Sequence, residues 1–464
     1  MSSEEAPNPS ADPGAGQSPF GDKLGRRGPE VYRSRDTPGG QETNFPCDVT
    51  PGGAGTTHNR GRGTTRIRPL LGDRLRIGID GTCLGSGRGY GRFLRELLPP
   101  LLAQDAHDYR LFLDAATASE VSLPDMPVER LVTGESQASA ASARGNRSPL
   151  DMLRMGRGVA RHRLDAFYFP SVFSYFPVPR RIPLAVAIHD TIPERYGQVV
   201  FPDLRTRWLW TIKSRLARWQ ATTLITVSDY ARHRIESEFH VRSDRIFVTP
   251  EGPSPAFAPP ETPGPRKAWL ESRGVPGDAR YLLYVGGFNP HKNVIGLVRA
   301  LGRLSLPEEL GLILVGDYAG DTFHGNVSAV RREIQLAGLA KRVHWAGFVP
   351  DEDLRHLYGG ALALVLPSLE EGFGLPAVEA AACGTPCVAT VESPLPQVLQ
   401  GGGLFFDPHE EGHLEGCLEE LWQRPDWRDQ LATTALARAR ALTWEATADA
   451  TRVALEETAR RGRR

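Results

Sequence analysis

The sequence predicts an α/β protein with two doubly wound, Rossmann-like domains that face a common cleft. Three observations support this prediction. The 464 residues exceed what one hydrophobic core usually organises. Short apolar strands alternate with amphipathic helices in two separate stretches, which is typical of parallel sheets. A proline-rich segment at residues 252–267 separates the stretches, and neither a helix nor a central strand continues through so much proline.

The first 73 residues are expected to form a disordered tail. They are rich in Gly, Pro, Ser, Thr and Arg and show no apolar periodicity, so they bury too little surface to offset the entropy cost of ordering. The chain start, MSSEEAPNPSADPG, lacks the apolar core of a secretory signal. No apolar run reaches the ~18 residues that span a bilayer. A cytoplasmic location is therefore expected.

The N-terminal domain is expected at residues 74–258. It opens with the strand RLRIGID, a glycine loop and the helix RFLRELLPPLL, as doubly wound domains do. Residues 134–147 are predicted to form a mobile loop because they are small and polar. Further strands are expected where apolar runs begin, at residues 109, 166, 184, 223 and 246.

A linker is expected at residues 259–278, followed by a second domain at residues 279–440 and a last helix at residues 441–464. Each strand and helix of the second domain together have the size of a βαβ unit, so right-handed crossovers and a parallel sheet are expected. The strands of this domain are expected to begin near residues 281, 310, 342, 363 and 386.

Composition argues against several classes of function. The 55 Lys and Arg residues balance the 55 Asp and Glu residues, so no overall charge predicts nucleic-acid binding. The cysteines include no C-x-x-C pair, and a zinc site would need a second ligand pair at comparable spacing. Reduced packing cysteines are therefore expected, with no metal and no organic cofactor. The five cysteines are Cys47, Cys83, Cys383, Cys387 and Cys417.

The most informative segment is LVLPSLEEGFGLPAVEAAACGTPCVAT at residues 364–390. A buried strand leads into a glycine loop, and a helix is expected to begin near Pro376. Backbone amides at such a helix N-terminus bind anions. Glu371 and Glu379 would then accept hydrogen bonds from sugar or ribose hydroxyls. From these features alone, the alternative is that both acids only stabilise the helix dipole.

This segment resembles the E-x(7)-E signature of glycosyltransferase family 4, whose members are retaining enzymes of the GT-B fold. The resemblance extends over about residues 76–448 and rests on several separate motifs. It implies that Glu371 lies at the donor sugar and that Glu379 binds the ribose hydroxyls. The backbone implied to cradle the sugar and diphosphate belongs to Gly372, Phe373, Gly374 and Leu375.

A second motif is YVGGFNPHKN at residues 284–293. Lys292 is predicted to open a helix, where a lysine is unfavourable for the helix dipole unless an anion is bound there. The resemblance implies that Lys292 binds the donor diphosphate, with Gly287 and Asn289 beside the donor.

The residues before this lysine depart from the commoner family pattern. Many members carry an arginine a few residues earlier, whereas this chain reads Phe-Asn-Pro at residues 288–290. The spacing resembles a mannosyltransferase-like subgroup with the pattern G-x-x-x-P-x-K-N. The leaving group would then have one cation fewer, for which His291 could partly compensate.

His189 follows an apolar strand in AVAIHDTIPERY, at the edge of the sheet where ligand-binding residues lie. A lone histidine there is more often structural. The resemblance implies instead that His189 contacts the donor sugar and that Asp190 orients the loop or the imidazole. The predicted catalytic residues are Glu371, His189 and Lys292.

Two further loops carry predicted binding residues. The segment GSGRGYGRF does not match the dinucleotide fingerprint, and the resemblance implies that Gly89 and Gly91 let the acceptor and the donor phosphate approach the backbone. The alternative is a tight turn with nothing bound. The backbone of Phe348 and Val349 is implied to receive the nucleobase. The last helix is implied to pack back on the N-terminal domain.

The resemblance implies a hexosyltransferase, acting for example in polysaccharide biosynthesis, that uses a nucleotide-diphosphate sugar. The subgroup pattern favours mannose carried by guanosine diphosphate, and the acceptor would be a glycan, a lipid-linked sugar or a small molecule. Front-face attack is favoured over a covalent intermediate, and no metal is expected because no D-x-D-type pair accompanies the donor loops. The alternatives are a nucleotide-sugar epimerase and a non-catalytic nucleotide-sugar-binding protein of the same fold.

A basic and aromatic stretch suggests peripheral contact with the inner face of a membrane. Residues 205–218 carry several arginines, together with Trp208, Trp210 and Trp219. An ordinary amphipathic helix is the favoured interpretation of this stretch.

Overall fold

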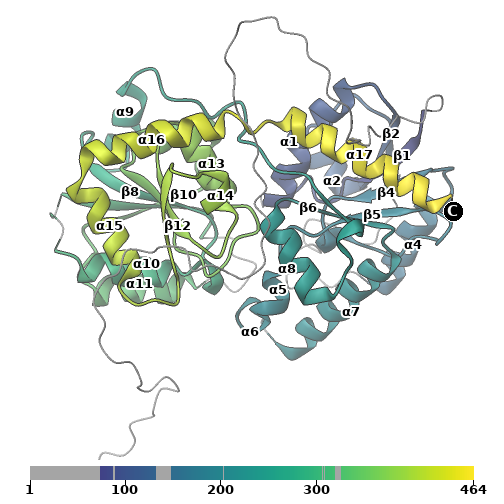
Figure 1. Ribbon diagram of the computed structural model, residues 1–464, viewed down its shortest axis with the longest axis horizontal. Coiled ribbons are helices and arrows are strands. Elements are labelled where there is room, and N and C mark those ends of the chain that lie inside the picture. The colour runs from purple at the N-terminus through teal and green to yellow at the C-terminus, as the bar shows by residue number, and fades with distance from the viewer. Residues whose placement is uncertain are drawn as a thin grey trace, which may run out of the picture. The chain divides into compact units, whose positions relative to one another are not determined.

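The computed structural model describes residues 74–86, 89–131, 148–201, 203–305, 307, 309–318 and 326–463. The tail predicted at residues 1–73 lies outside these residues, and so does the loop predicted at residues 134–147. The described chain contains two parallel sheets, each flanked by helices (Figure 1). This confirms the predicted pair of doubly wound α/β domains.

The first sheet has seven strands in the order β3-β2-β1-β4-β5-β6-β7. All neighbouring pairs are parallel. The chain reverses its winding between β1 and β4, and ligands of such sheets bind at the carboxyl ends near that switch point. The strands are β1 (Arg76–Asp80), β2 (Asp108–Asp114), β3 (Val128–Leu131), β4 (Ala166–Phe169), β5 (Leu184–Ala187), β6 (Thr223–Thr226) and β7 (Ile246–Val248).

Both faces of the first sheet are buried. In β4, Phe167 and Phe169 point into one apolar cluster, whereas Tyr168 points into another. Successive side chains of a strand alternate between faces, so this pattern requires helices on both sides. These helices are α1 (Gly89–Ala103), α2 (Ala115–Glu120), α4 (Pro149–Ala160), α5 (Ile192–Arg195), α6 (Gly197–Val200), α7 (Leu204–Gln220) and α8 (Asp229–Phe239).

The second sheet has six strands in the order β10-β9-β8-β11-β12-β13, again all parallel. Its switch point lies between β8 and β11, which are neighbours. The strands are β8 (Arg280–Val285), β9 (Leu310–Val315), β10 (Val343–Gly347), β11 (Ala363–Leu366), β12 (Cys387–Thr390) and β13 (Gly403–Phe406). The helices are α9 (Gly264–Ser272), α10 (Val294–Arg303), α11 (Val327–Leu336), α12 (Asp351–Gly360), α13 (Leu375–Ala382), α14 (Leu395–Val398), α15 (His413–Gln423) and α16 (Pro425–Ala439).

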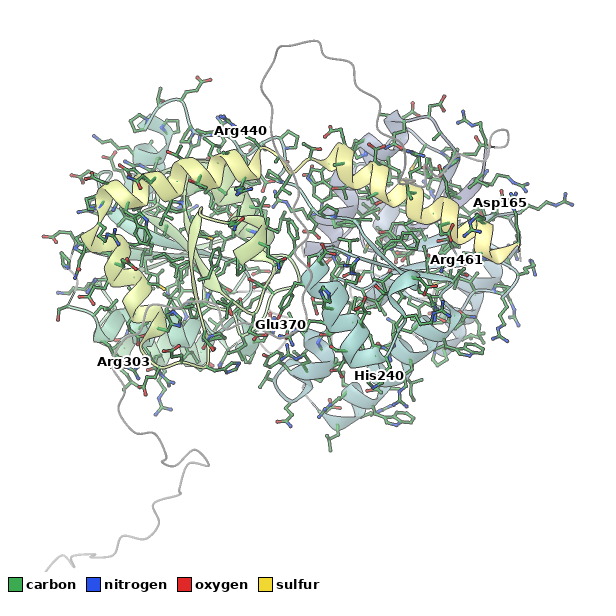
Figure 2. All side chains as sticks on the ribbon, in the orientation of Figure 1. Asp165, His240, Arg303, Glu370, Arg440 and Arg461 are labelled. Carbon is green, nitrogen blue, oxygen red and sulfur yellow. The ribbon has the colours of Figure 1, made fainter. Side chains whose placement is uncertain are left out.

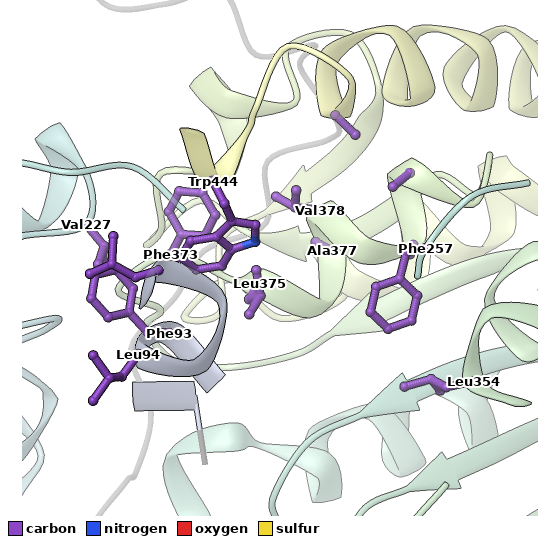
Figure 3. Close-up of a cluster of buried hydrophobic side chains, with 14 of the residues drawn as sticks. Phe93, Leu94, Val227, Phe257, Leu354, Phe373, Leu375, Ala377, Val378 and Trp444 are labelled. Atoms are coloured by element: carbon purple, nitrogen blue, oxygen red, sulfur yellow. The ribbon is translucent and has the colours of Figure 1, made fainter. Parts of the chain in front are cut away.

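The last helix, α17 (Trp444–Gly462), lies on the first sheet although it follows the second sheet in sequence. Thr443 caps its N-terminus by accepting a hydrogen bond from the Ala446 amide. Trp444 meets Phe93 of α1 edge-on, with ring centroids 5.7 Å apart. Figure 3 shows these two rings beside Phe373, in an apolar cluster that draws side chains from both sheets.

Some elements differ from the sequence prediction. The linker expected at residues 259–278 contains α9, because Pro265 fits the first helical turn and good helix formers follow it. Leu270 of α9 is fully buried. Lys292 does not open an α-helix: it ends a single 3₁₀ turn, and α10 begins two residues later. The edge strands β3 and β13 are short and were not predicted.

Three described cysteines behave as packing residues. Burial raises the pKa of Cys383, Cys387 and Cys417 to about 12, so their thiols stay protonated near neutral pH. Among the described residues, no helix is long and apolar enough to cross a bilayer. The same residues contain no group of three or more His, Cys, Asp or Glu side chains that could hold a metal ion.

Substituting the two glycines at the start of α1 should change the stability of the fold to different extents. A Cβ atom at Gly91 would lie 2.2 Å from the Ser86 carbonyl oxygen and 2.7 Å from that of Cys83, whereas one at Gly89 meets nothing within 4 Å. We expect Gly91→Ala to lower the free energy of unfolding by ~1–3 kcal/mol and Gly89→Ala to change it by under about 0.5 kcal/mol. Urea unfolding of both variants checks this, and equal effects would contradict it.

Candidate active site

The loops after β8 and β11 bring a cation and a carboxylate together. Lys292 follows β8 and Glu371 follows β11, and their Nζ and Oε1 atoms are 2.7 Å apart. The Ser368 hydroxyl also donates to Oε1 of Glu371, at 2.5 Å. Glu371 is only 7% exposed. The pairing leaves the ammonium, whose side chain is 25% exposed, as the more accessible of the two charges.

The glycine loop after Glu371 lies against the first sheet. The Ser228 hydroxyl donates to the Gly372 carbonyl oxygen at 2.9 Å and also caps α8. A Cβ atom at Gly372 would lie 2.4 Å from the His189 carbonyl oxygen, so only glycine allows this approach. The N-cap of α13 is Gly374. The side chains of Phe373 and Leu375 are buried, which leaves the backbone of this loop as the part that can contact a ligand.

Glu379 is the fifth residue of α13 and is 2% exposed. Tyr358 donates its phenolic hydrogen to Oε2 at 2.9 Å, and Nε of Arg92 lies 3.2 Å from Oε1. Burial raises the pKa of Glu379 to about 7, against the opposing effects of Arg92 and Tyr358. Both carboxylate oxygens are therefore occupied, one of them by an arginine of the first sheet's α1.

His189 is held between two acceptors. Its Nε2 lies 2.8 Å from the Pro170 carbonyl oxygen, and its Nδ1 lies 3.4 Å from Oε1 of Glu251. Burial lowers the pKa of His189, but Glu251 and the Pro170 carbonyl outweigh burial, so the net shift is upward. Because both nitrogens face oxygens that can only accept, the doubly protonated imidazolium is favoured. Asp190 accepts from the Ile192 amide at 2.9 Å and so braces the His189 loop.

The remaining predicted residues differ in accessibility. Gly89 is exposed and Gly91 is buried against the preceding loop. Phe348 is 77% exposed, whereas Val349 is 3% exposed and can offer only its backbone. In the loop after β8, the Gly287 carbonyl accepts from the Tyr284 hydroxyl, and Asn289 precedes the 3₁₀ turn that carries the lysine. The structure thus brings together Lys292, Glu371, Gly372 and the backbone of His189.

Sequence reasoning missed an ion-pair cluster beside Glu371. Glu370, which is labelled in Figure 2, is 2% exposed and pairs with Arg195 of α5. Glu392 pairs with Arg234 of α8. The Tyr230 hydroxyl donates to Glu392 at 2.9 Å. Each arginine lies in a helix that flanks the first sheet, and each acid lies in a loop that follows a strand of the second sheet. Only the Glu-Glu doublet at residues 370–371 hinted at this cluster.

Arg92 and Glu251 were also missed. Arg92 lies one position after Gly91 in the first turn of α1, and Glu251 follows the carboxyl end of β7. Their positions at that edge of the sheet were a usable signal. Their partners, which lie far away in the sequence, were not apparent.

A cavity of about 620 Å³ lies elsewhere, at the amino ends of β1 and β2, and is lined in part by Arg74, Asp105 and Tyr109. The predicted site residues follow the carboxyl ends of their strands. Ligands of doubly wound sheets bind at carboxyl ends, and Arg74 is paired with Asp105 at 2.6 Å. We therefore place the candidate site at the carboxyl ends of the strands despite the size of this cavity.

Comparison with known proteins decides the family. A family model described as glycosyl transferases group 1 matches residues 265–438, and one described as glycosyltransferase family 4 matches residues 88–256. O-antigen chain mannosyltransferase B of Escherichia coli is 32% identical over 279 residues, which cover 58% of this chain and 69% of that protein. The chain belongs to glycosyltransferase family 4. It is therefore a transferase enzyme rather than an epimerase or a non-catalytic protein.

Other relatives of this family 4 glycosyltransferase match over a shorter span. D-inositol 3-phosphate glycosyltransferase of Thermobifida fusca is 34% identical over 195 residues, 40% of this chain and 45% of that protein. The enzyme of that name from Frankia alni is 31% identical over 235 residues, 49% of this chain and 57% of that protein. The chain thus spans about half the length of these two relatives.

Solved structures show the fold of this glycosyltransferase. Sucrose-phosphate synthase from Thermosynechococcus elongatus superposes with a TM-score of 0.64 at 20% identity, over 82% of this chain and 98% of that one. HepE of Anabaena in complex with UDP-glucose gives 0.63 at 20% identity, over 82% and 99%. These likenesses confirm the GT-B fold, and at such identity they show the fold alone.

Removing Arg92 should destabilise the glycosyltransferase in a pH-dependent way. Arg92→Ala removes a cation that lowers the pKa of buried Glu379, so that pKa rises further above its ordinary value of 4.5. A carboxyl group whose pKa is higher in the folded state than in the unfolded state stabilises the fold at pH values below the unfolded-state pKa. This stabilisation is lost as the pH rises. We expect a loss of ~3 kcal/mol in unfolding free energy at pH 8 and a smaller loss at pH 5.

A control variant in the same helix tests the cause. Arg95 donates to the carbonyl oxygens of Leu84 and Ser86, so Arg95→Ala should cost a similar amount at both pH values. Urea unfolding at pH 5 and pH 8 measures both losses. A pH-independent loss for Arg92→Ala would contradict the assignment of Glu379 as its partner.

Proposed function

We propose that this glycosyltransferase moves a hexose, with retention of the anomeric configuration, from a nucleotide-diphosphate sugar held at the Lys292–Glu371 loops. The observation that carries the proposal is the 2.7 Å ion pair between these residues, at the switch point between β8 and β11. A partly exposed ammonium beside the glycine loop that precedes α13 provides positive potential for a diphosphate.

The leaving group needs positive charge because negative charge grows on the diphosphate as the glycosidic bond breaks. Lys292 supplies one full charge, and the amides at the start of α13 supply the positive end of the helix dipole. These groups provide the stabilisation that a metal supplies in other sites, so we propose that transfer needs no metal. We favour front-face attack, in which the departing phosphate takes the acceptor proton.

Glu371 and Glu379 have different proposed roles. Glu371 orients Lys292 and lies at the donor sugar. Glu379 would accept hydrogen bonds from the ribose hydroxyls through the lone pairs that Arg92 and Tyr358 leave unused. The Glu379 carboxyl is buried, and its pKa is raised to about 7. Hydroxyl groups that donate hydrogen bonds to the carboxylate would therefore stabilise its ionised form.

His189 would act through its charge rather than through a free ring nitrogen. Pro170 and Glu251 engage both nitrogens, so the imidazolium would contribute positive potential near the sugar. The His189 carbonyl oxygen lies against Gly372, and this backbone would help to shape the sugar pocket. We propose that Phe348 and Val349 receive the nucleobase and that the Gly89–Gly91 loop receives the acceptor.

We propose mannose as the sugar and guanosine diphosphate as its carrier. The subgroup pattern of the Lys292 loop favours this choice, and the Escherichia coli relative is named a mannosyltransferase. The Anabaena neighbour binds UDP-glucose, which makes that donor the necessary comparison. We propose a glycan or lipid-linked acceptor because the same relative is named for O-antigen chains.

Donor identity can be tested by thermal shift. A donor that binds only the folded state should stabilise it by ~2.7 kcal/mol when its concentration is 100 times its Kd. We expect GDP-mannose to raise the melting temperature more than UDP-glucose, with GDP and mannose alone as controls. Stabilisation by UDP-glucose alone would overturn the proposed donor, and a lack of stabilisation by any nucleotide sugar would overturn the proposed site.

Two substitutions should separate chemistry from binding. We expect Glu371→Gln to lower turnover by at least ~100-fold while the donor still raises the melting temperature, because glutamine can keep the Ser368 contact. Glu379→Ala should chiefly weaken donor binding and shrink the thermal shift. Glu411→Gln, at a side chain that is 85% exposed, serves as the control. Wild-type turnover in both site variants would refute the roles.

A further inference from the structure

An apolar stripe runs along the outside of α7, the helix that with α8 covers one face of the first sheet (Figure 1). The stripe consists of Leu204, Trp208, Ile212 and Trp219, which are 81%, 63%, 43% and 60% exposed. Their spacing places them along one side of a helix with 3.6 residues per turn. Trp210, Ser214 and Ala217 occupy the opposite, buried side.

This concentration differs from ordinary surface apolar residues. Scattered single exposed residues need no explanation. Among the described residues, however, four of the eleven exposed large apolar side chains lie on this one helix. A stripe containing two indoles is costly to keep in water unless another surface covers it.

The charges on α7 indicate what covers it. The helix LRTRWLWTIKSRLARWQ contains five Arg or Lys residues and no acidic residue. Arg205 and Arg215 are exposed beside the stripe, and the Arg180 guanidinium stacks on Trp219 at 4.1 Å. Lys213 and Arg218 bond to Phe173 and Ser214 instead. The face therefore combines indole rings with exposed positive charge.

We propose that this face of α7 binds the surface of a bilayer containing anionic phospholipids. Indole rings partition to the boundary between headgroups and acyl chains, and basic side chains are attracted to the negative surface potential. A helix with an apolar stripe and a basic flank lies in the plane of such an interface. The proposal concerns a separate surface and does not require the proposed donor.

The helix is joined firmly to the active-site loops. Trp210 Nε1 and Ser214 Oγ both donate to Oε1 of Glu194, at 3.0 and 2.9 Å. Glu194 lies in α5, next to Arg195, which pairs with Glu370 beside Glu371. A membrane bound at α7 would therefore hold the His189 loop at a set distance from the lipid surface, as transfer to a lipid-linked acceptor requires.

Co-sedimentation of the full chain with vesicles tests the proposal. We expect binding to phosphatidylcholine vesicles that contain phosphatidylglycerol, weakening with added salt, and little binding to phosphatidylcholine alone. Trp208→Ala combined with Trp219→Ala should weaken binding at least about tenfold. Leu336→Ala combined with Val453→Ala, at exposed apolar residues on other helices, should leave it unchanged.

A charge-reversal pair keeps the test decisive if the tryptophan variant fails to fold. Arg205→Glu combined with Arg215→Glu should weaken binding to anionic vesicles by roughly thirtyfold or more at low salt. Arg332→Glu combined with Arg440→Glu carries the same net charge and should bind like wild type. Circular dichroism melting of each variant reports whether it is folded.

Three results would overturn the proposal. The first is no binding of the wild type to anionic vesicles. The second is an equal loss of binding in the matched controls. The third is light scattering that shows a dimer dissociated by the tryptophan substitutions, without vesicle binding, since the stripe would then be a contact between two copies of the chain.

Discussion

The ion pair between Lys292 and Glu371 is the interaction on which the site depends. It exists because β8 and β11 are neighbours in a parallel sheet, so the loops that leave their carboxyl ends must meet. A single ammonium beside a helix N-terminus would repel the dipole. The carboxylate offsets that cost while the ammonium remains partly exposed. Anything negative that enters the site therefore competes with a protein carboxylate for an existing cation.

Several buried charges near the candidate site are paired, among the residues that the structure describes. His189 lies between Glu251 and a carbonyl oxygen, Glu379 has Arg92, and Glu370 has Arg195. Burying an unpaired charge costs several kcal/mol. The arginines lie in helices that flank the first sheet, and Glu370 and Glu379 follow strands of the second sheet. The ordered loops of one domain therefore depend on charged partners in the other domain. Burial raises the pKa of Glu379 and of Glu370 to about 7, and Arg92 and Arg195 act in the opposite direction.

The fold leaves the chemistry open. A sucrose-phosphate synthase and HepE share this architecture with the chain at about 20% identity over most of its length. The fold by itself therefore does not select the sugar. Selection depends on a few side chains and exposed backbone segments at the strand ends. The exposed ring of Phe348 and the Lys292 loop, which has no arginine at residues 288–290, are two such segments. A membrane-facing helix on the first sheet would also select the acceptor by its location, in addition to the contacts that the site makes with it.

The sequence by itself determined the two parallel sheets, because apolar runs, glycine loops and helix-forming stretches are local signals that recur at βαβ spacing. It also singled out Lys292, Glu371 and Glu379, since each lies within a short motif next to a strand or helix end. Only the tertiary structure decided which partners those groups have. Arg92 is 287 positions before Glu379, and no local pattern encodes such a contact. The short edge strands were likewise decided by packing, because burial against neighbours outweighs the weak propensity of a few residues.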